Sequence, residues 1–88
     1  MLLMHYRIRS AYSHSEGMAI DICVRLGRRI RLLREKQGWT QQQLADMTGI
    51  GRVHVSELEN GKREAGLRML EKLAATFEMT VSDILKEI

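Results

Sequence analysis

The sequence offers little for covalent or metal-based stabilisation. It contains no proline and a single cysteine, Cys23. One thiol cannot form an internal disulfide, and no Cys-x-x-Cys or paired Cys/His spacing is present, so we predict no metal site and no cofactor. The stability of the fold must therefore come from packing.

Long hydrophobic runs are also missing. No stretch approaches the ~20 consecutive apolar residues that a membrane-spanning helix requires. The apolar start, Met1 to Met4, is followed at once by His5, Arg7 and Arg9, which is too soon for the ~7 to 15-residue core of a signal peptide. These absences exclude an integral membrane protein and predict a cytoplasmic location.

The chain has 88 residues, of which 44% are hydrophobic and 28% are charged. This length lies at or below the usual size of one fold, so a second domain is excluded. A core this small buries only about 60% of the surface that the unfolded chain exposes. A partner surface would add stability, and dimerisation is therefore expected.

Positive charge is concentrated in one segment. The chain carries 14 Lys/Arg against 11 Asp/Glu, a mild excess, but residues 24–37 hold six basic residues against Glu35 alone. Such a block is either an ordinary solvated helix face or a surface that binds a polyanion, and charge alone does not separate the two.

The first 20 residues show no sustained helical period and are predicted to form an N-terminal extension, partly disordered, ahead of a domain over residues 21–88. Met4, Tyr6 and Ile8 alternate with polar residues, which is strand-like, but a lone strand has nothing to pair with. Met18 is an alternative start of translation.

Capping signals and apolar spacing predict two helices in the first half of the domain. Asp21 is a plausible N-cap for the first, whose apolar positions recur at helical spacing until Gly38. Thr40 and Gln43 form a capping-box pattern, so a short second helix starts at residue 41 and ends at Gly49. The apolar positions expected to face the core are Leu26, Ile30, Leu33 and Leu44.

Three further helices complete the pattern. The third opens at Gly51 and ends at Asn60-Gly61, a pair suited to a helix C-terminus. Thr80 caps the fifth, whose apolar face is expected to continue to Ile88. The third helix should bury Ile50, Val55 and Leu58; the stripe of the fourth is Leu67, Leu70, Leu73, Ala74 and Phe77, and that of the fifth is Val81, Ile84, Leu85 and Ile88. The pattern predicts an all-α bundle with short connections.

The second and third helices are separated only by residues 49–51. A turn this tight sets two helices at a steep angle, which is helix-turn-helix geometry. The outer, polar face of the second helix of such a unit is the surface that can be presented to a DNA major groove.

The residues of this unit resemble a known family. The matching runs are Ile30-Arg31, Trp39-Thr40-Gln41, Gln43-Leu44-Ala45, Gly49, Ser56 and Leu58-Glu59-Asn60-Gly61-Lys62-Arg63. They are similar to the Cro/repressor-like, or XRE-type, helix-turn-helix family over residues 24–86. The resemblance implies a compact five-helix lambda-repressor-like domain, usually a homodimer, that represses or activates transcription at a palindromic operator and has no catalytic role.

The resemblance assigns base readout to the start and outer face of the third helix, at Arg52, Val53, Ser56 and Glu57. An arginine such as Arg52 can donate two hydrogen bonds to guanine, Val53 can meet a thymine methyl, and Glu57 can accept from cytosine or serve as a surface carboxylate. The expected phosphate contacts are Gln41, Gln42, His54, Asn60, Lys62 and Arg63, with Arg28 and Arg29 as additional candidates.

Other positions are given structural roles. Arg34 and Glu59 match a pair that forms a salt bridge between the first and third helices of the family. The chain departs from the family at Ala65-Gly66, where Pro-Ser is common, and at Glu78, where glycine commonly ends the fourth helix. The candidates for a dimer surface are Met79, Val81, Leu85 and Ile88.

Several biological settings fit this interpretation: a restriction-modification controller, a phage-type repressor, or an antitoxin that regulates its own operon. An alternative function is a protein-interaction module whose main partner is a toxin or another protein. An enzyme based on Cys23 and a histidine is the remote option, because these residues lie on separate segments with no nucleophile motif.

Overall fold

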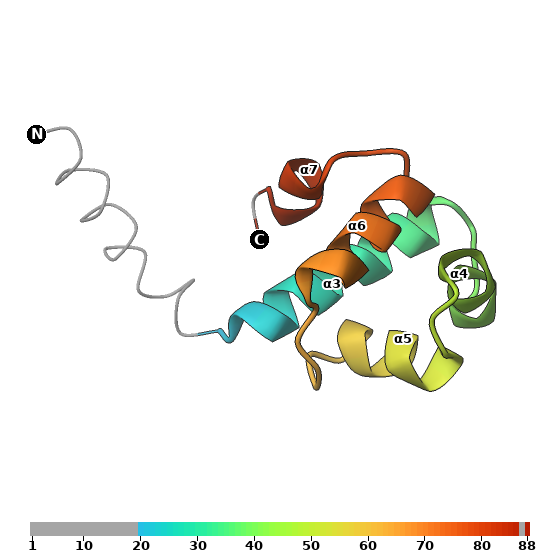
Figure 1. The fold of residues 1–88 in the computed structure, drawn as a ribbon. Helices are drawn as coiled ribbons and strands as arrows, with labels where there is room; N and C mark the ends of the chain where they lie inside the picture. Colours follow the sequence, from blue (N-terminus) through green and yellow to red (C-terminus); the bar gives the residue numbers. More distant parts are fainter. Residues whose placement is uncertain (1–19, 87) are drawn as a thin grey trace, which may run out of the picture.

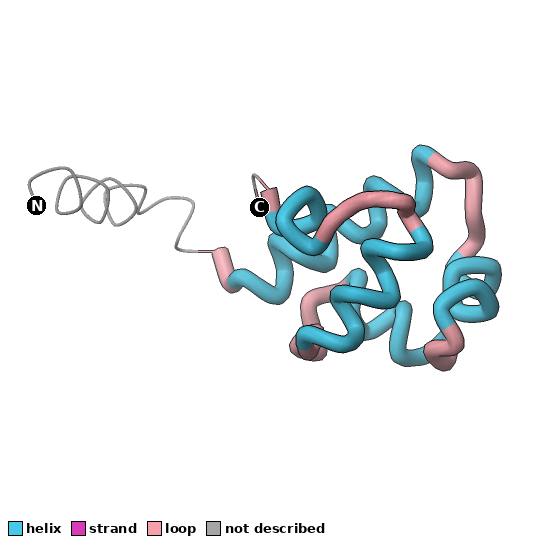
Figure 2. Tube along the Cα trace, turned by 45° about the horizontal axis from the view of Figure 1, so that its top comes forward, coloured by secondary structure: helices cyan, strands magenta, loops and turns pink. Residues whose placement is uncertain are grey.

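The computed structural model describes residues 20–86 and 88. Over this part of the chain the fold is all-α, with short loops and no strand (Figure 2). Its helices are α3 (Ile22–Lys36), α4 (Gln41–Thr48), α5 (Arg52–Glu59), α6 (Leu67–Thr76) and α7 (Val81–Leu85) (Figure 1). The predicted extension, Ile20 apart, lies outside the described residues, and so do the strand-like pattern and Met18.

Side-chain caps fix three of the helix starts where the sequence predicts them. The Asp21 carboxylate accepts from the backbone N–H of Cys23 at 2.8 Å. Thr40 and Gln43 form a complete capping box, with bonds of 3.0 and 2.8 Å in the two directions. Thr80 starts α7 in the same way. These caps satisfy backbone donors that the first turn of a helix leaves free.

The ends of α4 and α6 use the same backbone conformation with different residues. Gly49 ends α4 at φ +75°, in the left-handed region that glycine enters without steric cost. Glu78 follows α6 and also has a positive φ, +56°. The sequence places Glu78 where glycine commonly stands, and the structure shows a carboxylate-bearing residue held in a conformation that suits glycine better.

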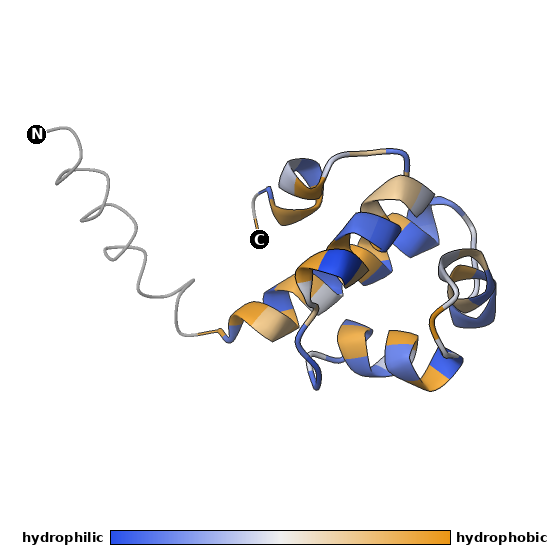
Figure 3. Ribbon diagram, viewed as in Figure 1, coloured by the Kyte–Doolittle hydropathy of each residue, from blue (hydrophilic) through white to orange (hydrophobic). Residues whose placement is uncertain are grey.

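The core lies where the apolar faces of the helices meet, and both apolar and polar residues occur along each helix in Figure 3. Trp39 stacks on Phe77 at its edge, with ring centroids 5.7 Å apart. Leu67, the first residue of the apolar stripe predicted for the fourth helix, stands in the first turn of α6 and is 79% exposed. The other predicted core residues at 26, 30, 33, 44, 50, 55, 58, 70, 73 and 77 are buried.

The last helix is shorter than predicted. The backbone becomes extended at Lys86, so α7 ends at Leu85 rather than at Ile88. Arg29 of α3 binds the carbonyls that a further turn would otherwise use, those of Asp83 and Ile84. Arg25 donates to a main-chain oxygen of Ile88, the last residue of the sequence. Tertiary hydrogen bonds thus replace helical ones here. No helix in the described part of the chain is long and apolar enough to cross a membrane.

Candidate nucleic-acid interface

Residues 49–51 join α4 to α5 and position the start of α5 at the surface. Gly51 precedes α5 and makes no side-chain cap. The first N–H groups of α5 therefore have no side-chain acceptor from that position, and the positive end of its dipole faces outward. An N-terminus of this kind is suited to meet an anionic ligand.

The two faces of α5 differ sharply. Val55, Leu58 and Glu59 are buried against the rest of the domain. Arg52 is exposed, and Val53 is 69% exposed. A large apolar side chain this exposed at the start of the outward helix has no packing role within the described domain. These two predicted readout residues are free to contact another molecule.

A close helix crossing holds the buried face of α5 in place. A Cβ atom on Gly27 of α3 would lie 2.3 Å from the carbonyl oxygen of Leu58 and 2.7 Å from that of Glu59. Only glycine permits this approach. Gly27 was not among the predicted functional or core residues, although a glycine inside an amphipathic helix is a recognised sign of close packing.

The ion pair expected between Arg34 and Glu59 is present at the same crossing. Arg34 Nε lies 2.6 Å from Glu59 Oε2, and Arg34 Nη2 lies 3.0 Å from Oε1. The Arg34 side chain is 11% exposed and that of Glu59 is 2% exposed. The hydrogen bond with Glu59 raises the pKa of Arg34. This bidentate geometry fixes the angle of α5 relative to α3.

Gln41 is connected to this ion pair. Its Nε2 donates to Glu59 Oε1 at 3.1 Å. The amide nitrogen of a glutamine carries two protons, so the second one stays available to an acceptor such as a phosphate. The sequence did not reveal this bond, because the two residues are far apart in the chain.

Two predicted base readers contact two predicted phosphate-binding residues. Arg63 lies 2.9 Å from Glu57 in an ion pair whose side chains are both partly exposed. Asn60 Nδ2 donates to the backbone carbonyl of Ser56 at 2.9 Å. The end of α5 and the loop that follows it therefore form one unit, and the charge of Glu57 is balanced by Arg63.

The remaining predicted DNA contacts are distributed around this unit. Gln42 is exposed and donates to Asp46 at 2.9 Å, one helical turn further on. Lys62 is exposed in the loop after α5, and His54 is half-buried. Arg29 does not join them: it contacts α7, on another side of α3. That additional phosphate contact is therefore not supported by its position.

The dimer candidates lie around α7. Met79, Val81 and Ile88 are half-buried and pack against the core, whereas Leu85 is exposed. The structure thus gives three of the four a packing role within the domain. Leu85 is the candidate whose side chain is most available to a second copy.

Cys23 is partly exposed, and burial together with the neighbouring Asp21 raises the pKa of its thiol. The environment therefore disfavours the reactive thiolate. Among the residues that the structure describes, no group of three or more His, Cys, Asp or Glu side chains is arranged to hold a metal ion.

A short α4, a tight turn and an outward α5 locked from behind define a helix-turn-helix DNA-binding domain. A family profile for helix-turn-helix domains matches residues 30–84. The chain belongs to the XRE-type helix-turn-helix family of DNA-binding transcriptional regulators.

Relatives and solved structures agree with this assignment. The chain is 48% identical over 59 residues to a competence pilus inhibition repressor from Acinetobacter baylyi; the match covers 67% of this chain and 54% of that protein, so the chain matches about half of its length. It resembles the structure of the restriction-modification controller protein C.AhdI from Aeromonas hydrophila with a TM-score of 0.68 and 32% identity, over 70% of this chain and 94% of the other.

A third similar protein was solved with its nucleic acid. The biofilm master regulator SinR, in complex with DNA, matches with a TM-score of 0.64 and 27% identity, over 69% of this chain and 98% of the other.

Proposed function

We propose that this protein is a sequence-specific transcriptional regulator, with repression as its main effect, that binds a palindromic operator as a homodimer. In this proposal α5 enters the major groove. Arg52 and Val53 contact base edges, and Ser56 and Glu57 lie further along the same helix. The observation that carries the proposal is the contrast between the locked inner face of α5 and its exposed start.

The contacts at the other end of α5 refine the predicted roles. Because Arg63 balances the charge of Glu57, the pair reduces the repulsion that an isolated carboxylate would exert on phosphates. Gln41 stands at the start of α4 with one amide proton free for a phosphate, and Lys62 and Asn60 flank the other end of α5. Gln42 and His54 complete the proposed set of phosphate-binding residues.

A homodimer supplies the symmetry that a palindromic operator requires. Two copies would place their α5 helices in successive major grooves, about 34 Å apart on one side of the duplex. Leu85, exposed on α7, is the proposed centre of the contact, with Ile88, Met79 and Val81 beside it.

The test is selection from a random duplex library at near-physiological salt, with sequencing of the bound pool and an affinity titration of the winner. The proposal predicts enrichment of an inverted repeat with half-sites one helical turn apart. An unenriched pool whose weak binding disappears with salt would indicate phosphate attraction alone. That result would favour the protein-interaction alternative, in which the main partner is a toxin or another protein.

A further inference from the structure

A basic pocket lies on the side of α3 that faces away from the recognition helix. It has a volume of about 430 Å³, and its basic wall consists of Arg25, Arg28, Arg29 and Lys86. The proposed DNA contacts on α4, α5 and the following loop do not include any of these residues, and Arg28, an additional phosphate candidate from the sequence, lines this pocket together with Arg29. The pocket thus gathers much of the positive charge of the segment over residues 24–37 at a place that operator binding does not explain.

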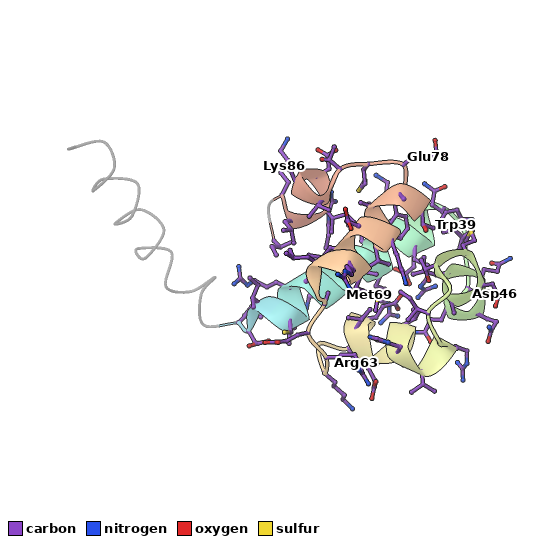
Figure 4. The ribbon with its side chains drawn as sticks, in the orientation of Figure 1. Trp39, Asp46, Arg63, Met69, Glu78 and Lys86 are labelled. Carbon is purple, nitrogen blue, oxygen red and sulfur yellow. The ribbon has the colours of Figure 1, made fainter. Side chains whose placement is uncertain are left out.

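Helix geometry separates this pocket from the DNA-binding side. Gly27 marks the face of α3 that touches α5. Arg25 and Arg29 are each two residues from Gly27, and at about 100° per residue both point roughly half a turn away from it. Lys86 and Arg63, which belong to the two sites, lie on opposite sides of the domain in Figure 4.

Two of the arginines are held in place by main-chain oxygens, and the one on Ile88 belongs to the last residue of the sequence, where it is a carboxylate oxygen. Arg25 donates to the main-chain oxygens of Ile20 and Ile88 at 3.1 and 2.9 Å. Arg29 donates to the carbonyls of Ile84 and Asp83 at 3.3 and 2.9 Å. A guanidinium has five N–H donors, so each keeps donors for a ligand. The carbonyls of Ile20, Asp83 and Ile84 fix the orientation of these groups without cancelling their charge, and only the bond from Arg25 to Ile88 offsets part of it.

The basic wall carries more positive charge than the neighbouring carboxylates of the described residues offset. The ion pairs in this part of the chain join Arg31 to Glu35, Arg34 to Glu59 and Arg63 to Glu57, all away from the pocket. The Asp83 carboxylate accepts from the backbone N–H of Thr80, and it also interacts electrostatically with Arg29 and Lys86 of the wall. Four cationic side chains thus face the Asp83 carboxylate and the terminal oxygen of Ile88, and this preorganised excess of positive charge favours an anionic ligand, because little ordering is needed on binding.

The pocket also has an apolar wall. Leu32 is 52% exposed, and Ile20 and Ile88 complete the lining, where Ile88 is also a flanking residue of the proposed dimer contact. Duplex DNA presents phosphates without apolar side chains beside them. An acidic peptide presents carboxylates and can carry apolar side chains next to them. We propose that this pocket is a docking site for an acidic segment of a partner protein, with carboxylates on the arginines and an apolar side chain against Leu32.

Fluorescence anisotropy on the full chain tests this proposal. The probe is a short fluorescein-labelled peptide in which glutamate and leucine alternate, and its matched controls are a glutamine–leucine peptide and polyglutamate. The variant with Arg28→Gln and Lys86→Gln removes two exposed charges that bind no described residue, so the fold should be unaffected. We expect it to weaken binding of the probe by about fivefold to tenfold.

A second variant and a matched control complete the design. Leu32→Ser should weaken binding of the glutamate–leucine peptide and leave binding of polyglutamate unchanged. The control variant, Arg68→Gln with Lys72→Gln, removes two exposed charges from α6, outside the pocket, and should bind the probe like the wild type.

Three results would overturn the proposal. The first is equal weakening by the pocket variant and the α6 control, which would mean diffuse charge attraction. The second is no difference between the glutamate and glutamine peptides. The third is loss of affinity for a random DNA duplex in the pocket variant, with a shallower salt dependence, which would make this surface a second nucleic-acid contact. Binding to the selected operator is measured separately, so failure here leaves the proposed function standing.

Discussion

The two short helices that α3 holds, α5 and α7, are stabilised in opposite ways. α5 starts at Gly51 with no side-chain cap, and it is fixed from behind by the Gly27 crossing and the buried Arg34–Glu59 pair. α7 starts with a complete capping box, and Arg29 of α3 binds two carbonyls near its end.

A small domain can present one helix to a ligand when that helix is held only from its buried side. Restraints on α5 come from its buried side, so its start and outer face carry no structural task and remain open for DNA. α7 has its start satisfied locally, and its end is bound by a guanidinium group. The predictions below separate tertiary from local stabilisation in these two helices.

The largest expected effect concerns the buried ion pair. Glu59→Ala leaves Arg34 without its carboxylate partner in a nearly buried site, and we expect it to cost about 3 to 5 kcal/mol in the free energy of unfolding. Glu35→Ala, which breaks the exposed pair with Arg31, is the matched control and should cost less than about 1 kcal/mol. Urea denaturation of both variants gives the comparison; similar losses would contradict the tertiary restraint on α5.

Gly27→Ala should be the next largest effect. Alanine is favoured over glycine inside a helix by about 1 kcal/mol, but its Cβ would collide with backbone carbonyls of α5. Overpacking of this kind costs about 1 to 3 kcal/mol, and we expect a net loss of stability in thermal unfolding. Gly27→Val should lose more. A gain in stability for the alanine variant would show that α3 and α5 do not meet this closely.

Glu78→Gly is expected to stabilise the domain. Glu78 holds a positive φ at the end of α6, a conformation that costs an L-residue about 1 to 2 kcal/mol. The substitution also removes a carboxylate from the negative end of the helix dipole. The control is Glu71→Gly inside α6, which should destabilise by about 1 kcal/mol. The same change should therefore have opposite signs at the two sites, measured as melting temperature.

The smallest effect is a pH dependence at the start of α7. Hydrogen bonds from Thr80 lower the pKa of the Asp83 carboxyl. Its contribution is therefore present at neutral pH and disappears as the pH falls below the ordinary pKa of 3.8 and through the lowered folded-state value. Asp83→Ala should melt below wild type at pH 7, and the gap should narrow on acidification toward pH 3. If the difference in melting temperature stayed constant with pH, the ionised form of Asp83 would not contribute to the stability of the cap.

Local signals in the sequence were sufficient to predict most of the helices. Asp21, Thr40 and Thr80 cap helices where they were predicted to do so, because capping depends on residues within one turn. The prediction was wrong for the length of α7, since the contacts that end it come from α3. Leu67 has the spacing of the predicted stripe, but it stands at the start of α6 and is exposed.

The site was predictable in outline and not in its connections. The start of α5 and the partners of the ion pair follow from the motif. The bond between Gln41 and Glu59, the pairing of Arg63 with Glu57 and the crossing at Gly27 join residues far apart in the chain or depend on how two helices meet. Periodicity assigns residues to faces, but it does not reveal which side chains meet across them.

The central claim is that the exposed start of α5 reads DNA sequence, and Arg52 is its most direct test. The measurement is a titration of wild type and Arg52→Ala against the selected operator and against operators changed at each position, with Arg68→Ala as the control. The account predicts a loss of about 1 to 3 kcal/mol in binding, together with relaxed preference at one base pair of each half-site. A folded Arg52→Ala variant that binds every operator as tightly as wild type would contradict it.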